Sequence, residues 1–382
     1  MSDCMNPSKL YRTYAEVDLD AIRRNGRIVR ASFPTERILC VLKADAYGHG
    51  IVGVLPAMED FADEYAVATV DEGLRVRSGS QKPVLLFGPV PEGRMAEAAR
   101  ARLSFTVGSV GYAERLSKVL AAEGLEAECQ LKLDTGLCRY GVPVPDSEEE
   151  LAAALASIYA HGNLHFRGTF THFACGEGTL DWEQEFTALQ FSRFRRALAL
   201  MERMGLPVGI RHCTSTGGSL VHKEYRMDMV RLGMMPLGMS YSDESVRALG
   251  LTPALRWVSF IAETKHLKPG DTVSYGCTFR AERPMRIALV SCGYADGYRR
   301  SYSGRASVLI GGRLTAVLGR IAMDYLMVDV TEIPEAEIGC EVSLLDWDGE
   351  HLLSAQTLSE WGESVSGEVT AAISPRVPRI YK

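Results

Sequence analysis

Basic side chains end several short apolar runs of this sequence, where a strand is expected to stop. Lys43 ends the run over residues 38–43, and other polar residues end similar runs: Lys132 with Asp134, His172, His212 and Arg231. A lysine at the inner end of a buried strand loses hydration, which lowers the pKa of its amine and makes the neutral form available as a Schiff-base nucleophile. Lys43 is therefore a candidate nucleophile. A lysine that merely extends from the strand end into solvent fits this run equally well.

A second group of residues suits an anion. The segment Ser215-Thr216-Gly217-Gly218 leads into a predicted helix and offers hydroxyls and backbone N–H groups. Gly233, after the run that contains Arg231, would add another N–H. Glycine pairs more often serve as ordinary turns. The anion reading is favoured because these residues follow the last two predicted strands, which supply the phosphate site in barrels of this kind.

The elements that must position these residues alternate between residues 38 and 245. Short apolar runs alternate with stretches of helical period, which predicts βα units around a parallel sheet. The runs are 38–43, 65–69, 83–87, 103–107, 127–133, 166–172, 208–212 and 227–231. Eight strands close a TIM barrel, whose strand ends share one rim. We also expect helices over about 20–31, from residue 146 onward, and over 182–204.

The pattern changes after about residue 248, where Val-, Ile- and Leu-rich runs are separated by glycine-rich turns. The predicted fold is α/β: an N-terminal (β/α)8 TIM barrel over residues 12–247 and a C-terminal mainly β domain over 248–382. We expect residues 1–11 to pack with the β domain.

Composition limits the classes of partner. The chain of 382 residues has a net charge of −6 and no run of basic residues, which argues against a nucleic-acid or anionic-membrane partner. No eighteen apolar residues are consecutive and the start lacks an apolar export segment, so a cytoplasmic protein is expected. Nine cysteines and eight histidines lack metal-ligand spacing, so we expect reduced thiols and no metal site.

A dinucleotide-binding motif is formally present. Residues 48–53 (GHGIVG) fit G-x-G-x-x-G, and Asp71 and Glu72 follow about twenty residues later. The motif is weak alone, and a Rossmann fold explains neither Lys43 nor eight βα units.

The decamer at residues 41–50 (VLKADAYGHG) resembles the signature of the alanine racemase family. Seven further segments resemble family motifs in the family's order: 132–139 (KLDTGLCR), 171–174 (THFA), 229–233 (MVRLG), 273–276 (VSYG), 293–297 (GYADG), 319–324 (GRIAMD) and 376–379 (RVPR). The resemblance implies a fold-type III pyridoxal 5'-phosphate enzyme, a barrel with a β domain. Such an enzyme interconverts L-alanine and D-alanine and supplies D-alanine as a peptidoglycan precursor.

Carried over residue by residue, the resemblance assigns two bases. It makes Lys43 both the lysine that holds the cofactor and the base on the D-side of the substrate. Tyr275 of the partner subunit becomes the base on the L-side. Racemisation requires two opposed bases, because a single fixed group would return the proton to the face it left. A half-buried strand tyrosine is the structural alternative for Tyr275.

The other carried-over residues surround the cofactor. Arg231 would face its pyridine nitrogen, and His172 would orient Arg231 or Tyr275. Arg139 would lie near the cofactor phenolate and the substrate carboxylate. Lys132 matches a lysine that is carbamylated in many members, whose negative charge holds that arginine. The alternatives are an Arg231 paired with Asp228 and a His172 that is only a core residue.

The resemblance also places a phosphate site and a substrate contact. The phosphate-contacting positions are Tyr47, Ser215, Thr216, Gly233 and Met234. The backbone N–H of Met323 would meet the substrate carboxylate from the partner chain. If Tyr275 and Met323 act in a neighbour's site, the protein is a homodimer with composite sites.

One position departs from the family pattern. Pro375 stands where the family usually has a tyrosine that reaches the phosphate and narrows the entrance. This departure leaves a serine racemase or a broad-specificity small amino-acid racemase as an alternative. A non-catalytic pyridoxal phosphate-binding protein is a further alternative, but such single-barrel proteins lack a β domain.

Overall fold

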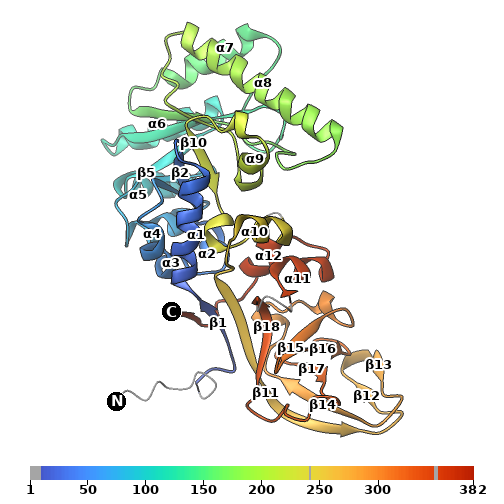
Figure 1. The fold of residues 1–382 in the computed structure, drawn as a ribbon. Coiled ribbons are helices and arrows are strands. Elements are labelled where there is room, and N and C mark those ends of the chain that lie inside the picture. The colour runs from blue at the N-terminus through green and yellow to red at the C-terminus, as the bar shows by residue number, and fades with distance from the viewer. Residues whose placement is uncertain (1–9, 241, 348–351) are drawn as a thin grey trace. The chain divides into compact units, whose positions relative to one another are not determined.

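The computed structural model describes residues 10–240, 242–347 and 352–382, with only the backbone of Leu352. The chain divides into two compact units, and Figure 1 labels many of their helices and strands. One contains the chain up to Ile22, Tyr47–Gly50, and everything from Leu237 onward; the other contains Arg23–Ala46 and Ile51–Pro236. Residues 1–9, most of the N-terminal segment expected to pack with the β domain, lie outside the described residues.

The unit from Arg23 to Pro236 is the predicted barrel. Its eight parallel strands are β2 (Arg37–Val41), β3 (Glu64–Val67), β4 (Val84–Leu86), β5 (Leu103–Val107), β6 (Ala127–Asp134), β8 (Leu164–Phe170), β9 (Ile210–His212) and β10 (Met229–Leu232). They are ordered β10-β2-β3-β4-β5-β6-β8-β9, and the two-residue β7 (Val142–Pro143) pairs with β6. Backbone bonds from Asp228 to Arg211 (3.1 Å) and from Arg231 to Thr214 (3.3 Å) join β10 to β9. Every predicted run overlaps one observed strand, which confirms the barrel.

Two strands that were expected to end at candidate site residues stop earlier than predicted. The run 38–43 was expected to be strand throughout, but β2 ends at Val41, and Lys43 begins the following turn. The strand β8 ends at Phe170, so His172 also lies beyond its strand. Both residues are therefore in rim loops, where chemistry in a barrel is concentrated.

Helices follow the strands of the barrel unit: α3 (Ile51–Met58), α4 (Val70–Arg77), α5 (Glu92–Arg100), α6 (Val110–Ala122), α7 (Glu148–Tyr159), α8 (Asp181–Arg203) and α9 (Thr216–Val221). Serine caps begin two of them: Ser109 accepts a bond from the backbone of Tyr112, and Ser147 from that of Glu150. Gly205, with φ 69°, follows the end of α8. The expected helix over 20–31 is α1 (Leu19–Ser32).

The other unit is mainly β. Its nine-stranded sheet contains β1 (Thr13–Val17), β11 (Leu255–Leu267), β14 (Met285–Val290), β15 (Ser307–Ile310), β16 (Arg313–Leu318), β17 (Leu326–Asp329), β18 (Glu341–Trp347), β19 (Leu352–Leu353) and β20 (Arg379–Tyr381). The order is β19-β18-β15-β16-β17-β14-β11-β1-β20, and β18 also pairs with β11. A hairpin of β12 (Thr272–Val273) and β13 (Phe279–Arg280) stands apart.

Three short helices, α10 (Asp243–Leu249), α11 (Ala355–Trp361) and α12 (Ser366–Ala371), accompany this sheet. Its core includes the buried side chains of Trp257, Tyr298 and Tyr302. The Trp257 ring meets Tyr298 edge-on at 5.8 Å, and its indole N–H donates to Thr13 at 2.9 Å. The N-terminal strand β1 is thereby fixed to the C-terminal domain.

No helix in the described part of the chain is long and apolar enough to cross a membrane.

Candidate active site

Arg231 is the centre of a buried polar network at the barrel rim. Its Nη1 donates to Nδ1 of His212 at 3.0 Å, and its Nη2 to Nδ1 of His172 at 2.9 Å. Nη2 also lies 3.0 Å from the carbonyl of Thr171 and 2.9 Å from that of Cys213. The guanidinium has five N–H donors and no acceptor, so each histidine must present an unprotonated Nδ1.

Burial and the charge of Arg231 together fix the state of both imidazoles. Burial, followed by the Arg231 charge, lowers the pKa of His172 and His212 well below their ordinary value. Both rings are therefore neutral, with the proton on Nε2. In His212, Nε2 donates this proton to Oε1 of Gln130, with 2.7 Å between the two heavy atoms, and the ring stacks on Phe170 with 4.7 Å between ring centroids. Burial lowers the pKa of Arg231 itself to about 10.

Asp228 is not the partner of Arg231. Its carboxylate instead pairs with Arg211, whose Nε and Nη2 both donate to it at 2.7 Å. The alternative of a structural Arg231–Asp228 pair is therefore wrong. Among the described residues, the hydrogen-bond partners of the Arg231 side chain are imidazole nitrogens and backbone carbonyls, which are all neutral. Its positive charge is therefore not neutralised by a hydrogen-bonded carboxylate in this part of the chain.

Lys132 points into the same region from β6. The residue is 6% exposed, and its Nζ lies 5.8 Å from the ring centroid of Tyr140 and 5.9 Å from that of Phe170. Burial and then the charges of Arg139 and Arg231 lower the pKa of Lys132 to about 8, against the opposing effect of Asp134. The protonated amine still predominates near physiological pH, but a minor fraction is neutral.

Lys43 begins a turn with unusual backbone geometry. The three residues after it, Ala44, Asp45 and Ala46, have φ/ψ near 52–56°/48–51°, a left-handed helical turn without glycine. Partial burial and then the charge of Arg139 lower the pKa of Lys43, while Glu72 opposes this effect. The charge of Arg139 thus lowers the pKa of both Lys43 and Lys132, as expected for residues of one rim.

The anion-binding segment follows β9. Ser215 has extended backbone geometry at the N-cap position of α9, but its side chain makes no capping bond. The Thr216 hydroxyl accepts a bond from the backbone N–H of Gly233 at 3.3 Å, which joins the loop after β9 to the loop after β10. Met234 follows Gly233 in that second loop. The uncapped helix start and adjacent hydroxyls fit a phosphate group.

Tyr275, Met323 and Tyr47 belong to the other unit. Tyr275 is 65% exposed and begins the 3-10 turn η4 (Tyr275–Cys277), and Met323 is 52% exposed. The Met323 carbonyl accepts a bond from Ala295 at 3.0 Å, which ties its loop to the segment 293–297. Burial raises the pKa of Tyr47 to about 12, so its phenol remains protonated.

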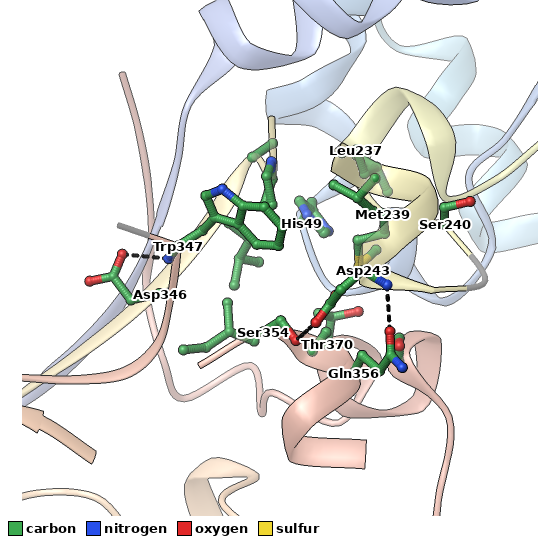
Figure 2. Close-up of a pocket in the computed structure, with 18 residues that line it drawn as sticks. His49, Leu237, Met239, Ser240, Asp243, Asp346, Trp347, Ser354, Gln356 and Thr370 are labelled. Carbon is green, nitrogen blue, oxygen red and sulfur yellow. Dashed lines mark hydrogen bonds between the residues drawn. The ribbon is translucent and has the colours of Figure 1, made fainter. Parts of the chain in front are cut away.

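A small cavity of about 30 Å³ lies within the same unit. Figure 2 shows His49, Met239 and Trp347 around it, with Asp243 bonded to the side chains of Ser354 and Gln356. The space is about that of one water molecule, so this cavity is too small for an amino-acid substrate.

Sequence reasoning missed two residues of the rim, Gln130 and Glu72. Gln130 holds His212, as described above. It precedes Lys132 by two positions in β6, and the strand period of two places both side chains on one face, a signal that could have identified it. Glu72 binds the turn after Lys43 across a gap of 28 residues, for which the sequence has no local signal.

Comparisons with known proteins agree over nearly the whole chain. Family models described as "Alanine racemase, N-terminal domain" and "Alanine racemase, C-terminal domain" match residues 17–241 and 254–381. The alanine racemase of Desulfovibrio desulfuricans is 35% identical over 371 residues, which is 96% of this chain and 97% of the relative. That of Symbiobacterium thermophilum is 36% identical over 374 residues, 97% of each.

Solved structures give the same result. The alanine racemase from a D-cycloserine-producing Streptomyces lavendulae has a TM-score of 0.90 at 34% identity and covers 97% of both chains. The Bacillus anthracis alanine racemase with bound L-Ala-P has a TM-score of 0.88 at 30% identity and covers 97% of this chain and 95% of that one.

Proposed function

Because the chain belongs to the alanine racemase family, we propose that it interconverts L-alanine and D-alanine with pyridoxal phosphate held at the barrel rim. The observation that carries the proposal is the network of Arg231 with His172 and His212, beside a lysine of lowered pKa. It provides a fixed positive charge and an amine of lowered pKa at the end of the barrel where chemistry is expected.

The residues at the rim fit the cofactor. Lys43 would bind it through its amine, and Arg231 would face the pyridine nitrogen. The groups that would hold its phosphate are the hydroxyls of Tyr47, Ser215 and Thr216 and the backbone N–H groups of Gly233 and Met234. When bound, pyridoxal phosphate withdraws electrons from the substrate α-carbon and so acidifies the α-proton.

Two residues of the chain would move that proton. The lowered pKa of Lys43 makes its amine available as the base on the D-side. Tyr275 of the partner subunit would act on the L-side, because its ring is exposed on the surface of its own chain and can enter a neighbour's site. Proton removal by one and delivery by the other inverts the configuration.

Arg231 would set the strength of the electron demand. A guanidinium cannot release a proton in this environment, and its N–H groups are fixed by neutral acceptors. Arg231 would therefore leave the ring nitrogen without an added proton, which keeps electron withdrawal moderate. That arrangement favours return of the proton to the α-carbon over side reactions.

Arg139 and Lys132 would hold the substrate side. Arg139 would contact the substrate carboxylate and the cofactor phenolate. The neutral amine of Lys132 can add carbon dioxide, forming an N–C bond and releasing one proton to solvent. The resulting carbamate would exchange a buried positive charge for a negative one between Arg139 and Arg231, which electrostatics favours. Carbon-13 NMR with labelled bicarbonate tests this modification.

We also propose a cytoplasmic homodimer with composite sites. The exposed large side chains of the β-domain unit include Tyr275, Tyr294, Met323 and Tyr325. Exposed aromatic and methionine side chains are typical of protein interfaces. Tyr275 and the backbone N–H of Met323 would then complete the partner's site.

Mixing two inactive variants tests the composite site. In a mixed dimer of Lys43→Ala and Tyr275→Phe, one site has lost both residues and the other has kept both. At equal mixing, half of the dimers are mixed, so activity should return to about a quarter of wild type. If mixing under subunit exchange restores nothing, Lys43 and Tyr275 act within one chain and the composite site is refuted.

Serine is the second candidate substrate, because Pro375 lies exposed where the family usually has a tyrosine. The relatives above are named alanine racemase, which does not favour this alternative. The deciding experiment supplies L-alanine and L-serine to the purified enzyme and measures the product enantiomers by chiral chromatography. Formation of D-alanine at the higher kcat/KM supports the proposal; absence of D-alanine would refute it. Lys43→Ala is the negative control.

A further inference from the structure

The turn that follows Lys43 is held in an unfavourable conformation. Ala44, Asp45, Ala46 and Tyr47 are four consecutive non-glycine residues with φ between 52° and 56°. A left-handed backbone brings each Cβ close to the following carbonyl oxygen, so such a run does not persist by intrinsic preference. Surrounding contacts must hold it, and these contacts decide where the backbone of Lys43 lies.

The carboxylate of Glu72 supplies the main contact at the start of this turn. Its Oε1 accepts bonds from the backbone N–H groups of Ala44 at 2.7 Å and Asp45 at 3.4 Å. Its Oε2 accepts bonds from those of Ala68 at 2.9 Å and Thr69 at 3.1 Å. One side chain at the start of α4 therefore joins the turn after β2 to the turn after β3.

The same helix also holds the middle of the turn. Asp45 accepts bonds at Oδ1 from the backbone N–H of Ile51 at 2.9 Å and from Arg75 at 3.3 Å. Arg75 follows Glu72 by three positions, so both side chains leave the same face of α4. The turn is thus held by two side chains of α4 and by the backbone N–H of Ile51 in α3, and the backbone bond from Ala46 to Leu42 at 2.8 Å adds to these contacts.

We propose that Glu72 is a positioning residue for Lys43: its bridging carboxylate holds the left-handed turn and thereby places the lysine amine for cofactor capture and proton transfer. This inference rests on the proposed role of Lys43. Ala44 is bonded directly to Lys43 in the chain, so any movement of its N–H moves the lysine backbone. A displacement of about 1 Å at a reacting group costs up to about 100-fold in rate. The negative charge of Glu72 also raises the pKa of Lys43, whereas the positive charge of Arg139 lowers it.

The test is Glu72→Gln with Glu183→Gln as its matched control. Glu183 holds the same position in the first turn of α8, where its Oε2 accepts a bond from the backbone N–H of Leu180 at 3.0 Å, far along the chain from the Lys43 turn. A glutamine keeps the shape of the side chain but has only one acceptor oxygen. Glu72→Gln can therefore accept bonds from the turn after β2 or from the turn after β3, but not from both.

Three measurements apply to each variant: apoprotein Tm, the rate at which apoprotein gains cofactor absorbance when pyridoxal phosphate is added, and kcat and KM with L-alanine. We expect Glu72→Gln to slow cofactor capture about tenfold and lower kcat about 10- to 100-fold, with KM changed less than about threefold. Glu183→Gln should change only Tm.

Thr69→Ala separates positioning from helix capping. The Thr69 hydroxyl accepts a bond from the backbone N–H of Glu72 at 3.2 Å, so its loss weakens the cap of α4 but leaves the Glu72 carboxylate on Ala44. We expect a lower Tm with capture rate and kcat near wild type. If Glu72→Gln does not fold, Glu72→Asp replaces it, because aspartate keeps the charge but is too short to bridge both turns.

Two results would overturn the inference. One is a Glu72 variant whose cofactor-capture rate and kcat equal those of Glu183→Gln. The other is a Thr69→Ala variant whose cofactor-capture rate and kcat fall as far as those of the Glu72 variant. Borohydride reduction and peptide mapping of the wild type distinguish this failure from failure of the proposed function. A wild type that carries no cofactor on Lys43 refutes the role of Lys43 itself.

Discussion

The buried amine of Lys132 makes a quantitative prediction about stability. Its pKa is lowered from an ordinary value of 10.5 to about 8. Each pH unit by which the pKa is lowered corresponds to about 1.4 kcal/mol, so keeping this lysine protonated costs the folded protein about 3–4 kcal/mol. Lys132 is only 6% exposed, so solvent screening reduces this figure little. Lys132→Met, which keeps the length of the side chain without its charge, should therefore stabilise the apoprotein at pH 7.5.

The stabilisation should depend on pH in a defined direction. Below about pH 8, Lys132 is protonated in both the folded and unfolded states, and the penalty is fully present. Between about pH 8 and 10.5 the folded state has lost the proton and the unfolded state has not, so wild-type stability rises with pH. The advantage of Lys132→Met should shrink across this window, because the variant has no proton to lose.

Thermal unfolding of the apoprotein in carbonate-free buffer measures this effect. For a folding unit of about 200 residues, the Tm difference between Lys132→Met and wild type should shrink by roughly 5–10 °C from pH 7.5 to pH 10. Lys118→Met, at an exposed lysine of α6, controls for the loss of one positive charge. A Tm difference that is the same at both pH values would show that Lys132 is not desolvated, and the argument for its carbamylation would lose its basis.

Three further perturbations test the site and the fold. Tyr275→Phe should lower kcat about 100- to 10,000-fold while the cofactor absorbance remains, because only the acidic hydroxyl is lost; unchanged turnover would refute the two-base assignment. Arg231→Lys should shift the absorption spectrum of the bound cofactor, since a lysine cannot bond both histidines, whereas Arg211→Lys, which affects only an outer ion pair, should leave the spectrum unchanged. Asp296→Ala removes a fully buried carboxylate that pairs with two arginines and should lower stability by about 2–3 kcal/mol in urea unfolding; a loss below about 0.5 kcal/mol would contradict the packing described.

The sequence predicted the architecture well because the signals for it are local. Each barrel strand is a short apolar run with its own period, and the eight runs could be recognised one at a time. The change of pattern after residue 248 similarly indicated the β domain. Family membership confirms the predicted fold and the predicted amino-acid racemase. The individual site residues, the domain boundary and the homodimer stay predictions.

Errors arose where strands end. Lys43 and His172 were expected to terminate strands, but the structure places both in the following loops. Apolar composition continues past the last ladder hydrogen bond, so a run of side chains does not mark where the backbone turns away. The left-handed turn after Lys43 could not be foreseen either, because alanine and tyrosine have no intrinsic preference for positive φ.

The lysine and its place on a barrel rim followed from the sequence alone, because residue type and strand period are properties of short segments. The partners of Arg231 and the carboxylate that holds the Lys43 turn were decided only by the tertiary structure. His172 and His212 are 59 and 19 residues from Arg231, and Glu72 is 28 residues from Ala44. Closure of the barrel brings these groups within hydrogen-bonding distance, and no local pattern encodes which of many polar side chains will meet.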